Sequence, residues 1–287
     1  MPAPSQPLSL LSLAADVAGC YQALPQVEAV TVGGSLGSGI SDADSDIDLY
    51  VYIRSEIPVT VRAAITSARS RLAEVDNRFW ELGDEWVEAG SGVSVDVILR
   101  DVPWIEEQLD RVLLRYEASV GYTTCLWYNV LSSRVLVDRS GWFQALQEFA
   151  AQPYPEPLRR AIVAKNYPLL RQTISSYAHQ LEKAIGRSDL VSVNHRIAAL
   201  LASYFDVLFA LNRVPHPGEK RLVEASLTRC TLVPERLSEQ VSALIGAAGQ
   251  GNRDVLAHAH ALVDGLDCLL QAEEFLLAPA RVSGGEP

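Results

Sequence analysis

The stretch Gly33–Tyr52, GGSLGSGISDADSDIDLYVY, constrains the fold more than any other part of this chain. It begins with glycines and serines, continues through spaced aspartates, and ends in alternating polar and apolar residues. Alternation with a period of two predicts a β-strand, in which Ile47 and Leu49 face one side while Asp46 and Asp48 face the other. The sequence therefore predicts two carboxylates that project side by side from the beginning of a strand.

The residues before these aspartates predict an anion-binding turn. Val27–Val32 is expected to form a short strand that ends at a pair of glycines, and the serine-rich residues that follow can start a helical turn. The free backbone N–H groups of such a turn face an anion. We expect Gly34, Ser35 and Ser38 to contact phosphate, with a hydroxyl donor from Ser35.

The ligand chemistry of the predicted strand favours Mg²⁺. This hard cation prefers oxygen ligands and usually takes one or two protein carboxylates together with substrate phosphates. Asp42 and Asp44 are an alternative pair to Asp46 and Asp48. We favour the later pair because it lies inside the strand, where the side-chain directions are fixed.

The pattern Gly34-Ser35, a spacer, Asp46-Ile47-Asp48 and an apolar strand resembles the nucleotidyltransferase superfamily of DNA polymerase β type. The similarity is to its minimal members and to its antibiotic-modifying members, of which the latter act on aminoglycosides or lincosamides. It covers roughly the first hundred residues. It implies a third carboxylate on a later strand, and the alternating segment Val93–Leu99 supplies Asp96. It also implies two Mg²⁺ ions held by these three aspartates, and a nucleoside triphosphate, expected to be ATP.

The resemblance and the periodicity together predict an α+β protein with two domains. Residues 1–152 are expected to form the catalytic domain, a mixed sheet flanked by helices. The proline-rich run Pro153–Pro157 marks the expected boundary. Residues 153–287 are expected to form an all-α helical bundle over the cleft for acceptor and nucleotide, with helices in Leu158–Gly186, Asp189–Leu211, Leu237–Ala248 and Asp254–Leu277.

Within the first domain, local patterns predict further elements. Helices are expected at Leu8–Leu24, Pro58–Leu72, Pro103–Tyr116, Gly121–Val130 and Trp142–Ala150, and additional strands at Phe79–Glu88 and Arg134–Asp138.

The charge balance bears on the acceptor. A formal net charge of −11 argues against a nucleic acid substrate, because binding of a polyanion needs a basic surface. The same charge favours a small hydroxylated acceptor that is cationic. The side chains expected to offer it acidic or aromatic contacts are Glu81, Glu85, Glu88, Trp80, Trp86 and Tyr52.

A triphosphate also needs cationic partners besides Mg²⁺, and the segment 33–41 contains neither Lys nor Arg. Lys220, in a loop of the predicted bundle, is the expected partner. The alternatives are Arg221, Arg196 and Arg54.

The cysteines indicate the cellular compartment. Cys20, Cys125, Cys230 and Cys268 are isolated, with no spacing typical of a zinc site or a disulfide framework. Isolated thiols are typical of a reducing compartment. We therefore expect a cytoplasmic protein that does not cross or bind a membrane.

The sequence thus predicts an enzyme that transfers a nucleoside monophosphate from a triphosphate to a hydroxyl of a small molecule, and releases pyrophosphate. Two alternatives stay open. One is a minimal-nucleotidyltransferase antitoxin that binds or adenylylates a partner protein. The other is a degenerate nucleotide-binding regulator, which the absence of a basic residue from segment 33–41 favours.

Overall fold

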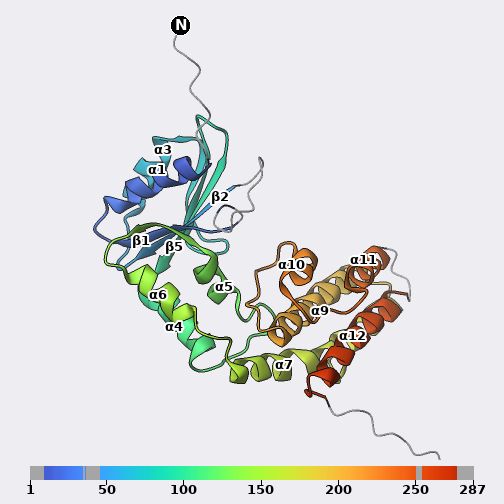
Figure 1. Ribbon diagram of the computed structural model, residues 1–287. Coiled ribbons are helices and arrows are strands. Elements are labelled where there is room, and N and C mark those ends of the chain that lie inside the picture. The colour runs from blue at the N-terminus through green and yellow to red at the C-terminus, as the bar shows by residue number, and fades with distance from the viewer. Residues whose placement is uncertain (1–9, 35, 37–45, 250–253, 277–287) are drawn as a thin grey trace, which may run out of the picture. The chain divides into compact units, whose positions relative to one another are not determined.

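The computed structural model describes residues 10–34, 36, 46–249 and 254–276 (Figure 1). The chain divides into two compact units, which are described separately below. The first comprises residues up to Leu114 together with Leu126–Pro153, and the second comprises Arg115–Cys125 together with the residues from Tyr154 onward. The predicted ranges 1–152 and 153–287 differ from this division chiefly in the short segment Arg115–Cys125, which belongs with the helices.

The first unit is built on a six-stranded sheet with the strand order β3-β4-β5-β2-β1-β6. Strands β2 and β5 are parallel neighbours, and every other neighbouring pair is antiparallel. The strands are β1 (Val27–Val32), β2 (Ile47–Ile53), β3 (Ser70–Asn77), β4 (Gly83–Glu88), β5 (Ser94–Asp101) and β6 (Arg134–Asp138).

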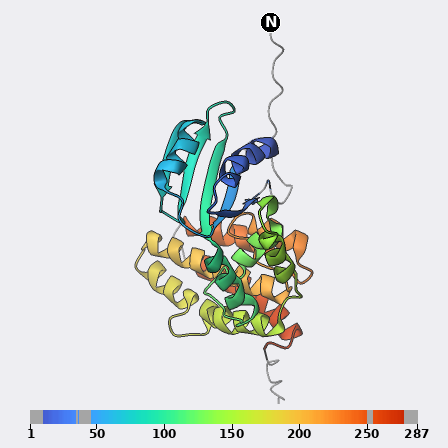
Figure 2. The ribbon, with the colours of Figure 1, turned by 90° about the vertical axis from the view of Figure 1, so that its left-hand side faces the viewer.

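Helices cover both faces of this sheet (Figure 1). We name the faces after one helix each. The α1 face packs against α1 and α3, which Figure 2 shows in front of the strands, and the α4 face lies toward α4, α5 and α6. These helices are α1 (Leu10–Gln22), α3 (Val59–Ser67), α4 (Val102–Leu113), α5 (Cys125–Ser132) and α6 (Trp142–Ala150).

The alternation of the strands decides which residues line each face. On the α1 face, Leu49, Val51 and Val97 are fully buried against helix residues such as Val17. On the α4 face, the ring of Tyr52 packs against Trp142 and Phe143 of α6, with ring centroids 5.4 and 4.9 Å away. The alternation that predicted the β2 strand therefore places its apolar residues in the core of this unit.

The second unit is all α-helical. Its long helix α9 packs against each of the other five helices, and buried side chains such as Leu200, Tyr204 and Leu208 form the centre of the core. The helices are α7 (Glu156–Arg171), α8 (Tyr177–Gly186), α9 (Leu190–Leu211), α10 (Leu222–Arg229), α11 (Leu237–Ala248) and α12 (Asp254–Ala272). The predicted fold class, a mixed sheet with helices followed by a helical region, is confirmed.

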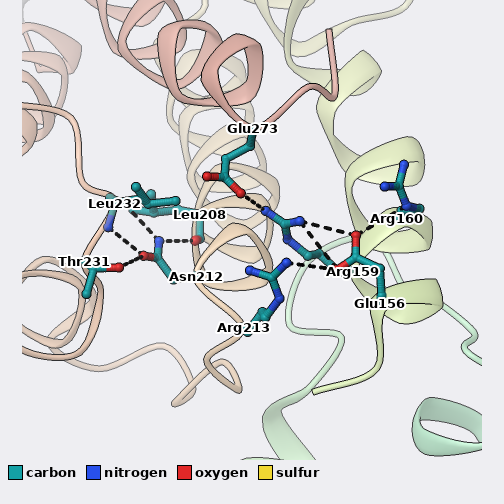
Figure 3. A network of polar contacts seen from close by, with 9 residues as sticks. All are labelled: Glu156, Arg159, Arg160, Leu208, Asn212, Arg213, Thr231, Leu232 and Glu273. Atoms are coloured by element: carbon teal, nitrogen blue, oxygen red, sulfur yellow. Dashed lines mark hydrogen bonds and ion pairs between the residues drawn. The ribbon is translucent and has the colours of Figure 1, made fainter. Parts of the chain in front are cut away.

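An ion-pair network joins the ends of three helices in this unit (Figure 3). The buried Arg159 of α7 donates to Glu273, just after α12, at 2.6 Å, and to Glu156 at 3.3 Å. Arg213, just after α9, also donates to Glu156, at 3.2 Å. Nearby, Asn212 bonds the backbone of Leu208 and Leu232 at 2.8 Å each and fixes the loop after α9 (Figure 3).

Buried polar groups of the second unit hold the segment Arg115–Cys125. The Asp206 carboxylate accepts hydrogen bonds from the Thr123 N–H at 3.0 Å and the Thr123 hydroxyl at 2.6 Å. The Asn166 side chain accepts from the Gly121 N–H at 2.8 Å and donates to the Ser119 carbonyl at 2.9 Å. This pairing explains why the segment belongs with helices far away in sequence.

The structure differs from the predicted elements most clearly at β3 and α10. The helix expected over Pro58–Leu72 ends at Ser67, and the residues after it form β3, which no pattern had indicated. Residues 71–74 of β3 are all exposed because the strand lies at the edge of the sheet, so it lacks the alternation that marks a half-buried strand. Helix α10 was also missed, since it is only eight residues long.

No helix in the described ranges is long and apolar enough to cross a lipid bilayer.

Candidate metal and nucleotide site

The parallel pairing of β2 with β5 brings Asp48 and Asp96 together. The two aspartates are direct partners in the register, and each lies within the first three residues of its strand. Directly opposite residues point to the same face, and neighbouring strands lie about 4.8 Å apart. The two carboxylates therefore project side by side from the α4 face, and both are partly buried.

The register extends this pair into a line of four acids. Asp96 lies opposite Glu85 of β4, and Glu85 lies opposite Glu74 of β3. We call Asp48, Asp96, Glu85 and Glu74 the acidic row. Like charges directly opposite each other destabilise a sheet, so a row of this kind indicates a function that outweighs the cost, and a bound cation would offset the repulsion.

The electrostatics of Asp96 reflect this crowding. Burial, together with the negative charges of Asp48, Glu85, Glu81 and Asp46, raises its pKa to about 6. A cation bound at the row would favour the ionised carboxylate instead.

The glycine turn lies directly beside Asp48. The Gly33 N–H donates to the Asp48 carbonyl at 2.9 Å, and Gly34 has a φ of +57°, a left-handed conformation that glycine adopts without strain. A Cβ atom at Gly34 would collide with Asp48 Oδ2, and one at Gly33 would collide with the ring of Tyr50. Glycine at these positions lets the turn lie directly against the Asp48 carboxylate and the Tyr50 ring without a clash.

The residues present fit a single Mg²⁺ bound jointly with phosphates. Asp48 and Asp96 supply two hard oxygen donors, and the space at Gly34 lies against one of them. Asp46 is exposed and precedes the paired part of β2. Within the described residues, no group of three or more Asp, Glu, His or Cys side chains is placed to hold a metal ion, so a site built from Asp46, Asp48 and Asp96 together stays a prediction.

The described structure does not test the other predicted nucleotide contacts at this turn. Ser35 and Ser38 lie outside the described residues, as do Asp42 and Asp44. Lys220 is exposed in the loop before α10 of the second unit, and its role stays a prediction. Arg54 donates to the buried Glu28 at 2.5 Å, so it already has an anionic partner.

The residues expected to contact a cationic acceptor divide into several groups. Tyr52 and Trp86 are buried in the core of the first unit, so the expectation that they offer open aromatic faces was wrong. Trp80 is 96% exposed, on the loop before β4. Glu85 belongs to the acidic row, whereas Glu88 accepts a hydrogen bond from Trp86 Nε1 at 3.2 Å.

Sequence reasoning missed a buried cation on the α4 face, Arg100 of β5. It pairs with Glu81 through two hydrogen bonds of 2.8 Å each and donates to Asn129 Oδ1 at 2.7 Å. A signal was available, because Arg100 follows Asp96 by four residues on one strand and must share its face.

Comparisons with known proteins give three findings. A model for a domain of unknown function, DUF4037, matches residues 124–222, which is less than half of the chain. A nucleotidyltransferase-like protein from Exiguobacterium sibiricum aligns over 92% of this chain and 75% of its own, with 11% identity and a TM-score of 0.42. The CCA-adding enzyme of Thermotoga maritima, solved in complex with tRNA, aligns over 92% and 82%, with 13% identity and a TM-score of 0.33.

No curated protein sequence matches the chain. Structural similarity at these TM-scores does not establish a shared fold, so the function is inferred below from the residues of this chain.

Proposed function

We propose that this protein transfers a nucleoside monophosphate from a nucleoside triphosphate, expected to be ATP, to a hydroxyl group of a small cationic acceptor. The bond between the α-phosphorus and the pyrophosphate oxygen breaks, and a bond to the acceptor oxygen forms. Pyrophosphate leaves, and the proton of the acceptor hydroxyl is released to water. The observation that carries the proposal is the direct pairing of Asp48 with Asp96 beside the turn at Gly34.

Each of these residues has a distinct task. Asp48 and Asp96 would hold Mg²⁺, whose contribution when bound is to neutralise phosphate charge at the reacting centre. The turn at Gly33 and Gly34 would present its backbone to phosphate oxygens next to the Asp48 carboxylate, which lies directly against Gly34. Asp46, with Ser35 and Ser38, would complete the two-ion site and the phosphate contacts that the sequence pattern predicts.

The charges of the site support a cationic acceptor. The exposed Glu85 and Glu74 continue the row away from Asp96, so an acceptor that approaches along β4 and β3 meets carboxylates. Amines are attracted to such a surface and polyanions are repelled by it. This favours a hydroxylated amine over RNA or DNA.

The test is a mass measurement. The protein is incubated with Mg²⁺ and each of the four nucleoside triphosphates, together with a panel of hydroxylated amines and with tRNA. We expect a mass increase of one nucleoside monophosphate on an amine, which Asp48→Asn abolishes and the control Asp101→Asn preserves. Asp101 is an exposed carboxylate at the other end of β5 and makes no capping bond to α4. Labelling of tRNA alone would overturn the proposed acceptor class.

One observation favours a second candidate, transfer to a hydroxyl of a partner protein. Phe79 and Trp80 are adjacent and 79% and 96% exposed, and exposed aromatic residues are common anchors in protein interfaces. The same incubation with a cell extract in place of the amine panel separates the candidates, since this candidate requires the mass increase to fall on a protein.

A further inference from the structure

Arg100 is a buried charge that lies on the same face as the candidate site but does not belong to the acidic row. Only 5% of the residue is exposed, and its Nε, Nη1 and Nη2 atoms each donate to a partner on Glu81 or Asn129. These partners come from the loop before β4 and from α5. The guanidinium is therefore fixed in direction and is not available to bind a phosphate.

The guanidinium carbon of Arg100 lies over the ring of Tyr50. The Arg100 Cζ atom is 4.2 Å from the centre of the Tyr50 ring, within the range of a cation–π contact. Tyr50 follows Asp48 by two residues on β2, so the two side chains share a face. The ring thus stands between the fixed arginine and the residues of the candidate site.

On its other edge, the same ring touches the glycine turn. The Tyr50 Cε2 atom occupies the position where a Cβ atom of Gly33 would lie. The Gly33 N–H in turn bonds the Asp48 carbonyl, and Gly34 lies against the Asp48 carboxylate. An unbroken line of contacts therefore connects Glu81 and Asn129 through Arg100, Tyr50 and the turn to Asp48.

We infer that Arg100 is a positioning residue for the candidate metal site, and that it acts by holding Tyr50 against the Gly33–Gly34 turn. This inference rests on the proposed function, because it takes Asp48 as a ligand of a divalent cation. The groups around a metal ligand fix its orientation, and their removal commonly lowers metal affinity by about 10- to 100-fold. Arg100 would have this effect across two intervening contacts.

The test measures binding of Mn²⁺ alone by electron paramagnetic resonance, with no nucleotide present. The variants are Arg100→Met and Arg100→Lys, and we expect the first to weaken Mn²⁺ binding about tenfold. Arg100→Lys keeps the charge but loses the two hydrogen bonds to Glu81 and the guanidinium contact with the Tyr50 ring. It should therefore weaken Mn²⁺ binding less than Arg100→Met does. Tyr50→Ala removes the ring and should resemble Arg100→Met.

Arg62→Met is the matched control. Arg62 is an equally buried arginine of the same unit that pairs with Asp84 on the α1 face. Its loss should lower the melting temperature as much as Arg100→Met does, yet leave Mn²⁺ affinity unchanged. This control separates a loss of positioning from a general loss of stability.

Three results would overturn the inference. They are wild-type Mn²⁺ affinity in both Arg100 variants, an equal loss in Arg62→Met, and the absence from the wild type of an Mn²⁺ site that Asp48→Asn removes. The proposed transfer is judged separately by the mass measurement. If no acceptor is labelled but Mn²⁺ binding depends on Arg100, the positioning role is supported and the proposed transfer is not. If an acceptor is labelled but Mn²⁺ binding does not depend on Arg100, the transfer is supported and the positioning role is not.

Discussion

In the first unit, the carboxylates on the two faces of the sheet have neighbours of opposite charge. On the α1 face, Asp84 is fully buried and pairs with the equally buried Arg62, and it also accepts a hydrogen bond from the Asp76 N–H at 2.9 Å. On the α4 face, Asp96 lies between Asp48 and Glu85, which are also acids. Asp84 therefore has a cationic neighbour from the chain, whereas Asp96 has an acidic residue on each side.

This difference separates a structural carboxylate from a candidate functional one. An ion pair that satisfies both partners contributes to folding, and its removal leaves a buried charge alone. A line of like charges weakens the folded state, and a bound cation would offset the repulsion. The two faces therefore predict opposite consequences when a carboxylate is removed.

The largest expected effect is that of Asp48→Asn on catalysis. The variant loses one of two paired metal ligands, so nucleotidyl transfer should fall by about 10³-fold or more. The free energy of unfolding should stay the same or rise, because a repulsive charge is removed. Single-turnover transfer at saturating Mg²⁺ measures the first quantity and urea denaturation measures the second. Turnover near that of the Asp101→Asn control would exclude Asp48 from the site.

The second largest effect is a loss of stability on removal of the buried carboxylate of the α1 face. Among the described residues, Asp84→Asn leaves the buried Arg62 with the partly exposed Asp76 as its remaining ion-pair partner, so the free energy of unfolding should fall by about 3 kcal/mol. Urea denaturation of Asp84→Asn, of Arg62→Met and of the double variant gives the coupling between the two residues. Mn²⁺ affinity should be unchanged. An additive double variant would mean that the ion pair contributes nothing specific to stability.

Features of the fold and the candidate site could be predicted from the sequence where they depend on neighbouring residues, and not where they depend on residues far apart in the chain. The carboxylates Asp48 and Asp96 were predictable because each stands in its own alternating segment, and a strand fixes side-chain direction locally. That they are direct partners was not predictable, since parallel pairing across some fifty residues leaves no local pattern. The Arg62–Asp84 pair was missed for the same reason.

Strand β3 was missed because its exposed edge residues have no apolar alternation, and without β3 the position of Glu74 opposite Glu85 could not be foreseen. Tyr52 and Trp86 were misassigned to a cleft because aromatic side chains beside acids look alike in sequence whether they are buried or open. Register and burial, both long-range properties, decided these cases.

A third carboxylate extends the comparison to the helical unit. Asp206 is 1% exposed and accepts hydrogen bonds from Thr123 and Asn166, without an ion-pair partner among the described residues. Burial raises its pKa, and the hydrogen bonds from Thr123 lower it only in part, so that the pKa is about 7. The folded state thus holds a proton that the unfolded state releases near pH 4.

The sign of the pH effect follows from this difference. The stability contributed by protonated Asp206 is complete below about pH 4, is lost at about 1.4 kcal/mol per pH unit as the pH rises, and is gone above about pH 7. Asp206→Asn should remove this slope. Unfolding followed by circular dichroism between pH 5 and pH 8 measures it in both proteins. An equal slope in the variant would assign the dependence to another group.

The smallest expected effect tests whether the acidic row destabilises the sheet at all. Glu74 and Glu85 are directly opposite and exposed on β3 and β4, so Glu74→Lys turns a repulsive pair into an attractive one. Cross-strand pairs of this kind differ by about 0.2–1 kcal/mol, and urea denaturation should show a gain of that size that shrinks at high salt. Glu74→Gln should give a smaller gain, since it removes the repulsion without adding attraction.

Glu239→Lys, which breaks an exposed pair with Arg236 in the helical unit, is the control and should lose stability instead. A loss in Glu74→Lys would mean that the row is already neutralised within the chain, and the case for an external cation would then rest on Asp48 and Asp96 alone.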